Sequence, residues 1–236
     1  LVGSEMCIRD SAYVGIVVGA GFSTGQEVMQ FFTPYGLWSY IGVLISGLIL
    51  GFIGRQVAKI GTAFEATNHE STLKYLFGEK FSKIFDYILV FFLFGIAVTM
   101  IAGSGSTFQE SFGIPTWLGA LIMTIVIYLT LLLDFNKIVR ALGIVTPFLI
   151  IMVILITIYY LFAGSVPLNE VNSTVDKTSV FWGIVRGLMY GGLAFAVGFS
   201  TVVAIGGDAS KRKVSGGGAM FGGVIYTILL LSLIHI

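Results

Sequence analysis

The chain has 236 residues, of which 56% are hydrophobic and only 11% are charged, and its formal net charge is +1. Soluble domains carry about 25% charged residues, so this composition excludes an ordinary soluble domain and predicts an all-helical membrane protein. The net charge itself says little about partners; we expect a lipid bilayer and a small-molecule substrate, and no nucleic acid.

Both ends of the chain differ from the rest. Residues 1–11 and 231–236 resemble translated sequencing-adapter sequence, so we set them aside as non-native segments. The alternative is a native N-terminal tail and a short apolar end that continues the last helix. The first of these segments contains the chain's one cysteine, Cys7, so cysteine spacing carries no information on redox compartment.

Seven apolar runs are long enough to cross a bilayer, because about 20 apolar residues in a helix span its hydrocarbon core. In chain order they are residues 12–33, 37–58, 84–108, 116–133, 141–163, 181–206 and 214–233. Ten of the eleven loop lysines and arginines lie between spans two and three, four and five, or six and seven. Basic residues stay on the cytoplasmic side of short loops, so we expect the N-terminal side inside and the loop 164–180 outside.

Residues 59–83 are too polar to span the membrane but repeat apolar residues at helical spacing, as at Leu73, Leu76 and Phe77. This pattern favours a short helix at the inner membrane surface, and an ordinary solvated loop helix explains it equally well. His69 in this segment has no neighbouring set of metal ligands, so we expect a surface histidine.

Spans one and six combine glycines with polar residues near their middles. Span one contains Gly19, Gly21 and Gly25 beside the polar run from Ser23 to Glu27, and span six contains Gly187, Gly191, Gly192, Gly198, Ser200 and Thr201. Glycine-interrupted spans are typical of helices that unwind around a transporter's binding site. A helix restarting near Thr24 would direct its N–H groups at a substrate carboxylate. The alternative is that these small residues only allow close helix packing.

Glu27 and Arg186 are ionisable residues inside predicted spans. Charges at membrane depth usually pair or line a cavity, so we consider them gate candidates that form an ion pair, directly or through a water, and help to close the outer side of the site. In the alternative, Glu27 completes a capping box with Thr24, and Arg186 extends to the outer membrane surface.

The string GAGFSTGQE at residues 19–27 resembles the signature of the YkvI-type bacterial membrane proteins, which are placed in the amino acid-polyamine-organocation superfamily. The resemblance implies a LeuT-like fold of five-plus-five inverted repeats with broken helices one and six. Residues 12–163 would be the first repeat and residues 181–230 the start of the second. The substrate-binding candidates at the first break are Gly19, Ala20, Gly21, Phe22, Ser23 and Thr24; those at the second, by position alone, are Tyr190, Gly191, Gly192 and Phe195.

The resemblance implies part of a secondary active transporter in the bacterial cytoplasmic membrane, which moves a small, amino-acid-like solute by alternating access. We expect no enzyme activity, because the sequence shows no metal-ligand cluster, no nucleophile beside a base and no phosphate-binding loop. No cofactor is predicted, and Na⁺ or H⁺ coupling stays open, as does the oligomeric state. Two alternatives remain: a small-nutrient receptor or sensor on a transporter fold, and a structural membrane subunit that does not transport.

Overall fold

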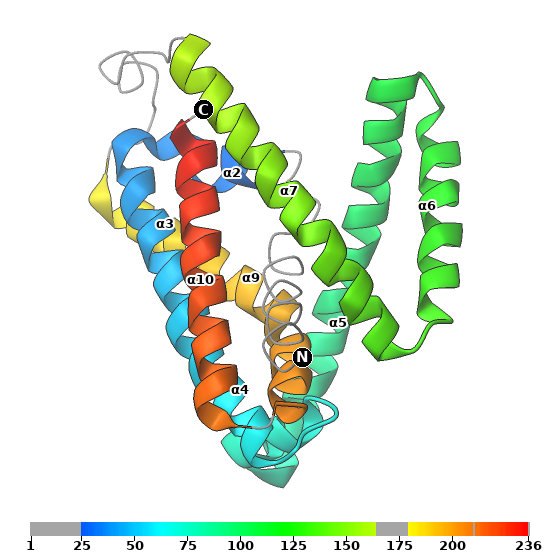
Figure 1. Ribbon diagram of the computed structural model, residues 1–236, viewed down its shortest axis with the longest axis vertical. Coiled ribbons are helices and arrows are strands. Elements are labelled where there is room, and N and C mark those ends of the chain that lie inside the picture. The colour runs from blue at the N-terminus through cyan, green and yellow to red at the C-terminus, as the bar shows by residue number, and fades with distance from the viewer. Residues whose placement is uncertain (1–24, 164–178, 210, 236) are drawn as a thin grey trace.

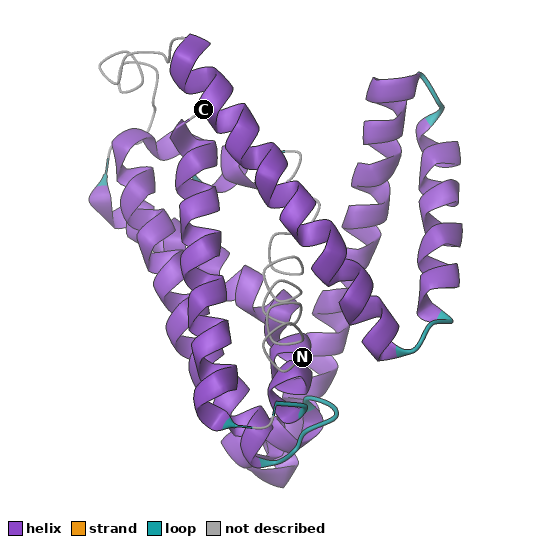
Figure 2. Cartoon of the chain, viewed as in Figure 1, coloured by secondary structure: helices purple, strands orange, loops and turns teal. Residues whose placement is uncertain are grey.

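The computed structural model describes residues 25–163, 179–209 and 211–235, and every secondary-structure element in these ranges is helical (Figures 1 and 2). The predicted span one lies mostly before residue 25 and so falls outside them. The helices are α2 (Gln26–Phe31), η1 (Thr33–Trp38), α3 (Ser39–Leu48), η2 (Ile49–Ile53), α4 (Gly54–Ala63), α5 (Glu70–Phe112), α6 (Thr116–Leu131), α7 (Phe135–Ala163), α9 (Val180–Gly207) and α10 (Arg212–His235).

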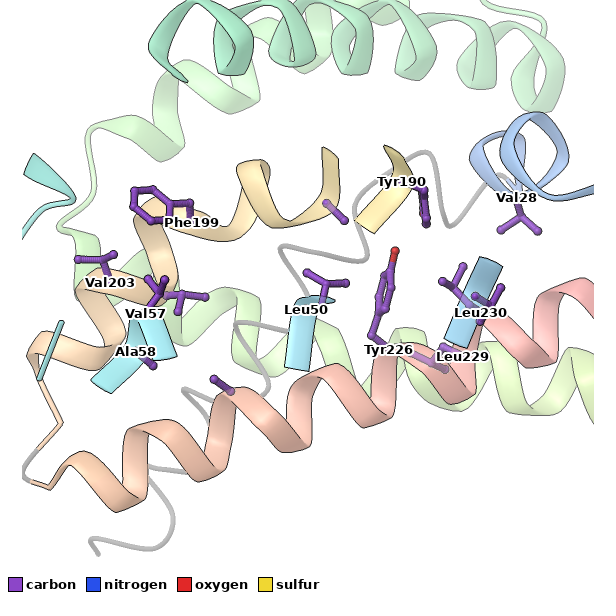
Figure 3. Close-up of a cluster of buried hydrophobic side chains, with 14 of the residues drawn as sticks. Val28, Leu50, Val57, Ala58, Tyr190, Phe199, Val203, Tyr226, Leu229 and Leu230 are labelled. Atoms are coloured by element: carbon purple, nitrogen blue, oxygen red, sulfur yellow. The ribbon is translucent and has the colours of Figure 1, made fainter. Parts of the chain in front are cut away.

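The core of the fold is a bundle in which one rod, built from η1, α3, η2 and α4, packs against α9 and α10 (Figure 1). The rod is long and apolar enough to span a membrane from Thr33 to Ala63. Apolar side chains from the rod, α9 and α10 meet between these three and are almost fully buried (Figure 3). Among them are Val43, Leu50, Val57, Tyr190, Val203, Tyr226 and Leu230.

Glycines form the seam between α9 and the rod. Gly183, Gly187 and Gly191 are spaced four residues apart, so they lie on one face of α9. A Cβ atom at Gly183 would lie 2.6 Å from the Trp38 carbonyl oxygen, and one at Gly187 would lie 2.6 Å from Cα of Gly42. The two backbones therefore touch directly, as in other small-residue helix interfaces of membrane proteins.

The register of these contacts gives the relative directions of the helices. Gly187 contacts Gly42 and the later Gly191 contacts the later Ser46, so α9 and α3 run parallel. Gly47 contacts Thr227 but the later Gly51 contacts the earlier Gly223, so α10 runs antiparallel to the rod. Spans two and six should run in the same direction, and span seven in the opposite one, if the chain crosses the membrane at every span. The observed directions agree with that alternation.

The predicted break in helix six is wrong. Helix α9 is continuous from Val180 to Gly207, and none of its residues has a positive φ. The physical reason lies in the seam, because the glycines that suggested unwinding instead remove side chains where the rod approaches. The packing alternative therefore explains Gly187 and Gly191.

The helices α5 and α6 form a hairpin that stands apart from the bundle, and α7 leans on α10 (Figure 1). The hairpin has its own close contact, since a Cβ at Gly105 would lie 2.5 Å from the Thr116 carbonyl oxygen. Large apolar side chains cover its outward surfaces; Phe91 and Trp117 are among the most exposed. Such surfaces suit a bilayer rather than water.

Four helical stretches in the described part of the chain are long and apolar enough to cross a membrane: residues 33–63, 70–112, 180–207 and 212–234. Two shorter apolar helices, Thr116–Leu131 and Gly143–Tyr159, match predicted spans four and five. These helices support a multi-pass membrane protein, while the count of seven spans and the inverted repeat stay predictions. The predicted loop 134–140 is shorter than expected, because α7 already begins at Phe135. Helix α10 also includes residues 231–235, which the sequence had suggested to be non-native.

Candidate functional site

The candidate site centres on Glu27, a carboxylate at the start of a short helix. Gly25 adopts a left-handed conformation with φ 72°, and α2 begins at the next residue. This is close to the predicted restart at Thr24, but the N-cap residue is Gly25, which has no side chain to make a capping bond. The Glu27 carboxylate faces α9 instead, where its Oε2 accepts a 2.8 Å hydrogen bond from the Tyr190 hydroxyl.

Aromatic rings pack around Tyr190. The Tyr190 ring lies 5.1 Å from that of Phe31 and 5.1 Å from that of Phe32, the second edge-on, and 6.3 Å from the Tyr226 ring. Figure 3 shows the Tyr226 hydroxyl pointing from α10 toward Tyr190. Only 1% of Tyr190 is exposed, so the tyrosine that binds Glu27 is packed between α2 and α10, while the Glu27 side chain itself is half-buried.

Arg186 lies one helical turn before Tyr190 on α9 and binds a different tyrosine. Its Nε donates a 2.8 Å hydrogen bond to the Tyr35 hydroxyl, and its Cζ lies 5.6 Å from the Tyr35 ring centroid. The described residues therefore show no direct Glu27–Arg186 salt bridge, and a pair bridged by water stays a prediction. A charged side chain inside a membrane needs a hydrogen-bond partner. Here that partner is a neutral tyrosine hydroxyl for both Glu27 and Arg186.

The other predicted site residues do not join this cluster. Gly19 to Thr24 lie outside the described residues, and their role stays a prediction. Gly191 packs on Ser46 in the seam, whereas Gly192 is exposed, and a Cβ added to it would have no atom within 4 Å. The Phe195 ring lies beside Phe199, at 5.8 Å, further along α9.

The cluster offers an acid, aromatic faces and a cation in one place. Aromatic faces and a carboxylate together attract an ammonium group, and the Arg186 guanidinium one turn away can pair with a carboxylate. Among the described residues there is no group of three or more His, Cys, Asp or Glu side chains that could hold a metal ion. These residue types are able to contact an ammonium group and a carboxylate of one ligand.

A second polar network was missed, because the partly exposed His69 side chain, 22% accessible, is bonded to two other helices' residues rather than free at the surface. Its Nε2 lies 2.7 Å from Asp86 Oδ1 on α5, and its Nδ1 lies 2.8 Å from Ser200 Oγ on α9. One signal was present in the sequence, since Asp86 is an ionisable residue inside the predicted span 84–108. Tyr226 carried a similar signal, as a polar tip in the middle of span seven.

Two curated proteins of Bacillus subtilis (strain 168) resemble the chain. The uncharacterized membrane protein YkvI is 30% identical over 222 residues, which cover 92% of this chain and 62% of YkvI. The uncharacterized protein YyaD is 32% identical over 137 residues, which cover 58% of this chain and 39% of YyaD. The chain thus spans less than two thirds of either relative. No family profile and no solved structure matches it.

Proposed function

We propose that this chain is part of a YkvI-type secondary transporter that moves a small, amino-acid-like solute across the bacterial cytoplasmic membrane. In this proposal the N-terminal side is cytoplasmic, the fold is a LeuT-like one of the amino acid-polyamine-organocation superfamily in which helix six is continuous, and the protein is not an enzyme. The similarity to YkvI supports the relationship, and the apolar helices support the membrane setting.

One observation carries the choice of solute. Glu27 and Arg186 lie in the membrane region on neighbouring elements, and each is held by the hydroxyl of a tyrosine rather than by the other charge. An amino acid has an ammonium group and a carboxylate, so it complements both charges at once. Replacing weak neutral partners by opposite charges would stabilise the bound state.

One oxygen of the carboxylate is occupied by the protein's own contact in the described conformation. Tyr190 and Phe32 are each only 1% exposed and Glu27 is half-buried, so a solute that binds Oε2 must displace the Tyr190 hydroxyl. A site that opens only when its own contacts break is suited to alternating access, because solute and gate compete for the same group.

Binding should be measured on the protein in its native length, purified in lipid nanodiscs, with a panel of amino acids, amines and carboxylic acids. Zwitterionic amino acids should bind best, and Glu27→Gln should weaken their binding at least tenfold, because it removes the charge that meets the ammonium group. Glu110→Gln is the matched control, since Glu110 is exposed on α5, and it should bind as the parent does. If Glu27→Gln and Glu110→Gln bind every solute equally well, Glu27 is not part of the site.

A receptor or sensor on the same fold would need the same pocket. Uptake into proteoliposomes separates the two functions, because a transporter accumulates radiolabelled solute inside the vesicle and a sensor binds it without accumulation. Saturable binding without uptake would replace the transporter by the sensor. Absence of binding across the panel would favour the structural subunit.

A further inference from the structure

The chain reverses direction at Gly78 and thereby brings His69 back to α5. The two residues His69 and Asp86 are 17 positions apart, which a straight helix would separate by about 25 Å. Their side chains are instead in hydrogen-bond contact. Gly78 has φ 74° and ψ 171°, and Phe77 before it stacks on Phe85 after it at 4.1 Å between ring centroids. Residues 70–77 therefore fold back along the rest of α5.

The resulting contacts of His69 define the proton positions. An ionised carboxylate only accepts hydrogen bonds, so Nε2 carries a proton and donates to Asp86. In the neutral imidazole Nδ1 then accepts from the Ser200 hydroxyl. Histidine is the side chain that ordinarily changes charge between pH 5 and 8.

A proton taken from water onto Nδ1 keeps both contacts. Nδ1–H then donates to Ser200 Oγ, and the Ser200 hydroxyl proton turns to a backbone carbonyl one turn earlier in α9, as serines in helices commonly do. The imidazolium charge is balanced by Asp86, so its hydrogen bond becomes charge-assisted and stronger. Proton uptake thus tightens the link between α5 and α9.

We propose that His69, Asp86 and Ser200 form a proton-binding site that attaches the α5–α6 hairpin to α9, and that this proton is the ion coupled to transport. The second part rests on the proposed transporter function; the first does not. With the proton bound the hairpin is held against α9, and with the proton released it separates more easily.

The groups that face His69 come from α5 and α9. On α5 it interacts with Asp86 and with Glu70, and Glu70 is itself paired with Lys74 at 2.8 Å. On α9 the neighbouring groups are the Ser200 hydroxyl and the Phe199 ring, which carry no charge.

The charged residues of α4 face elsewhere. The side chains of Arg55 and Lys59 lie along Gly216 of α10. The bundle is also closed at this end by its own contacts, because Thr62 Oγ1 donates to the Gly206 carbonyl at 2.7 Å and lies 2.6 Å from Ser215 Oγ. Loosening His69 should therefore release the hairpin without opening the bundle.

The attachment can be measured in lipid nanodiscs with spin labels on cysteines that replace the exposed Tyr128 of α6 and Phe221 of α10, in a Cys7→Ser background. Between pH 5 and 8 we expect one short distance to give way to longer, broader distances. His69→Gln should abolish this response. His235→Gln, which removes the chain's other histidine, should leave it intact.

Asp86→Asn keeps the histidine and removes the balancing charge, so the transition should move to lower pH. This variant decides the question if His69→Gln does not fold. A pH response that is absent from the parent, equal in His69→Gln, or unmoved in Asp86→Asn overturns the proton site.

Coupling is tested separately in proteoliposomes loaded with a pH-sensitive dye. Uptake of the amino acid bound best should acidify the vesicle interior in the parent, and His69→Gln should lose this proton movement while it still binds the solute. Solute uptake without proton movement in the parent overturns the coupling. A pH-dependent distance without uptake of any solute overturns the transporter and leaves the proton site in place.

Discussion

Substituting Gly78 with alanine should destabilise the protein through its backbone alone. The conformation at φ 74° and ψ 171° is essentially restricted to glycine, and a side chain there costs about 1–3 kcal/mol. No atom lies within 4 Å of a Cβ at this position, so no steric clash with a neighbour adds to this cost. The expected rise in the unfolding constant is about 5- to 150-fold, since each 1.4 kcal/mol is tenfold.

Gly95→Ala is the matched control. Gly95 belongs to the same helix, has no atom within 4 Å of its Cβ position and has no positive φ. Alanine there should gain about 0.5–1 kcal/mol of helix stability. The two variants should therefore differ by about 1.5–4 kcal/mol in the free energy of unfolding.

Unfolding by a denaturing detergent in mixed micelles, followed by circular dichroism, measures this difference. Hydrogen exchange of residues 64–77 measures whether the fold-back detaches, and Gly78→Ala should raise that exchange while Gly95→Ala should not. Equal unfolding midpoints together with equal exchange in this segment would refute the reversal at Gly78 as the route by which His69 reaches Asp86.

Two further predictions concern packing and topology. Gly187→Ala should lower the free energy of unfolding in detergent by about 1–3 kcal/mol, because its Cβ would overlap the Gly42 backbone. Gly192→Ala has open space at its Cβ position and should be neutral or stabilising. Equal stability of the two variants would rule out the glycine seam. Single cysteines replacing Asn172 and Lys211 should react with an impermeant maleimide from opposite sides of the membrane, and labelling from one side would contradict the orientation.

The apolar runs predicted the membrane helices because a backbone in lipid must satisfy its own hydrogen bonds. The predicted span 181–206 lies within α9 and differs from its bounds by one residue at each end. Whether this span is broken or continuous could not be predicted in the same way. A glycine that permits unwinding and one that permits close packing are identical in sequence, and only the approach of Gly42 decides between them.

Partner choice was equally hidden from the sequence. The spacing of Arg186 and Tyr190 places both on one face of α9, so either could have met Glu27. Opposite charge favoured Arg186, but the structure pairs Glu27 with Tyr190. The His69 contact depends on a chain reversal at a single glycine, and apolar spacing across that glycine reads as one uninterrupted helix.

The continuity of α9 links the two polar networks in the proposed cycle. Tyr190 and Ser200 are ten residues apart, which is about 15 Å along a helix, so each network joins a different end of one rigid element to a different neighbour. Positive φ values occur outside α9, at Gly25 before α2 and Gly78 in α5 among others, and such residues can absorb hinge motion. Solute at Glu27 would then displace α2 and a proton at His69 would hold α5, while the glycine seam keeps α9 and the rod together as the body against which both move.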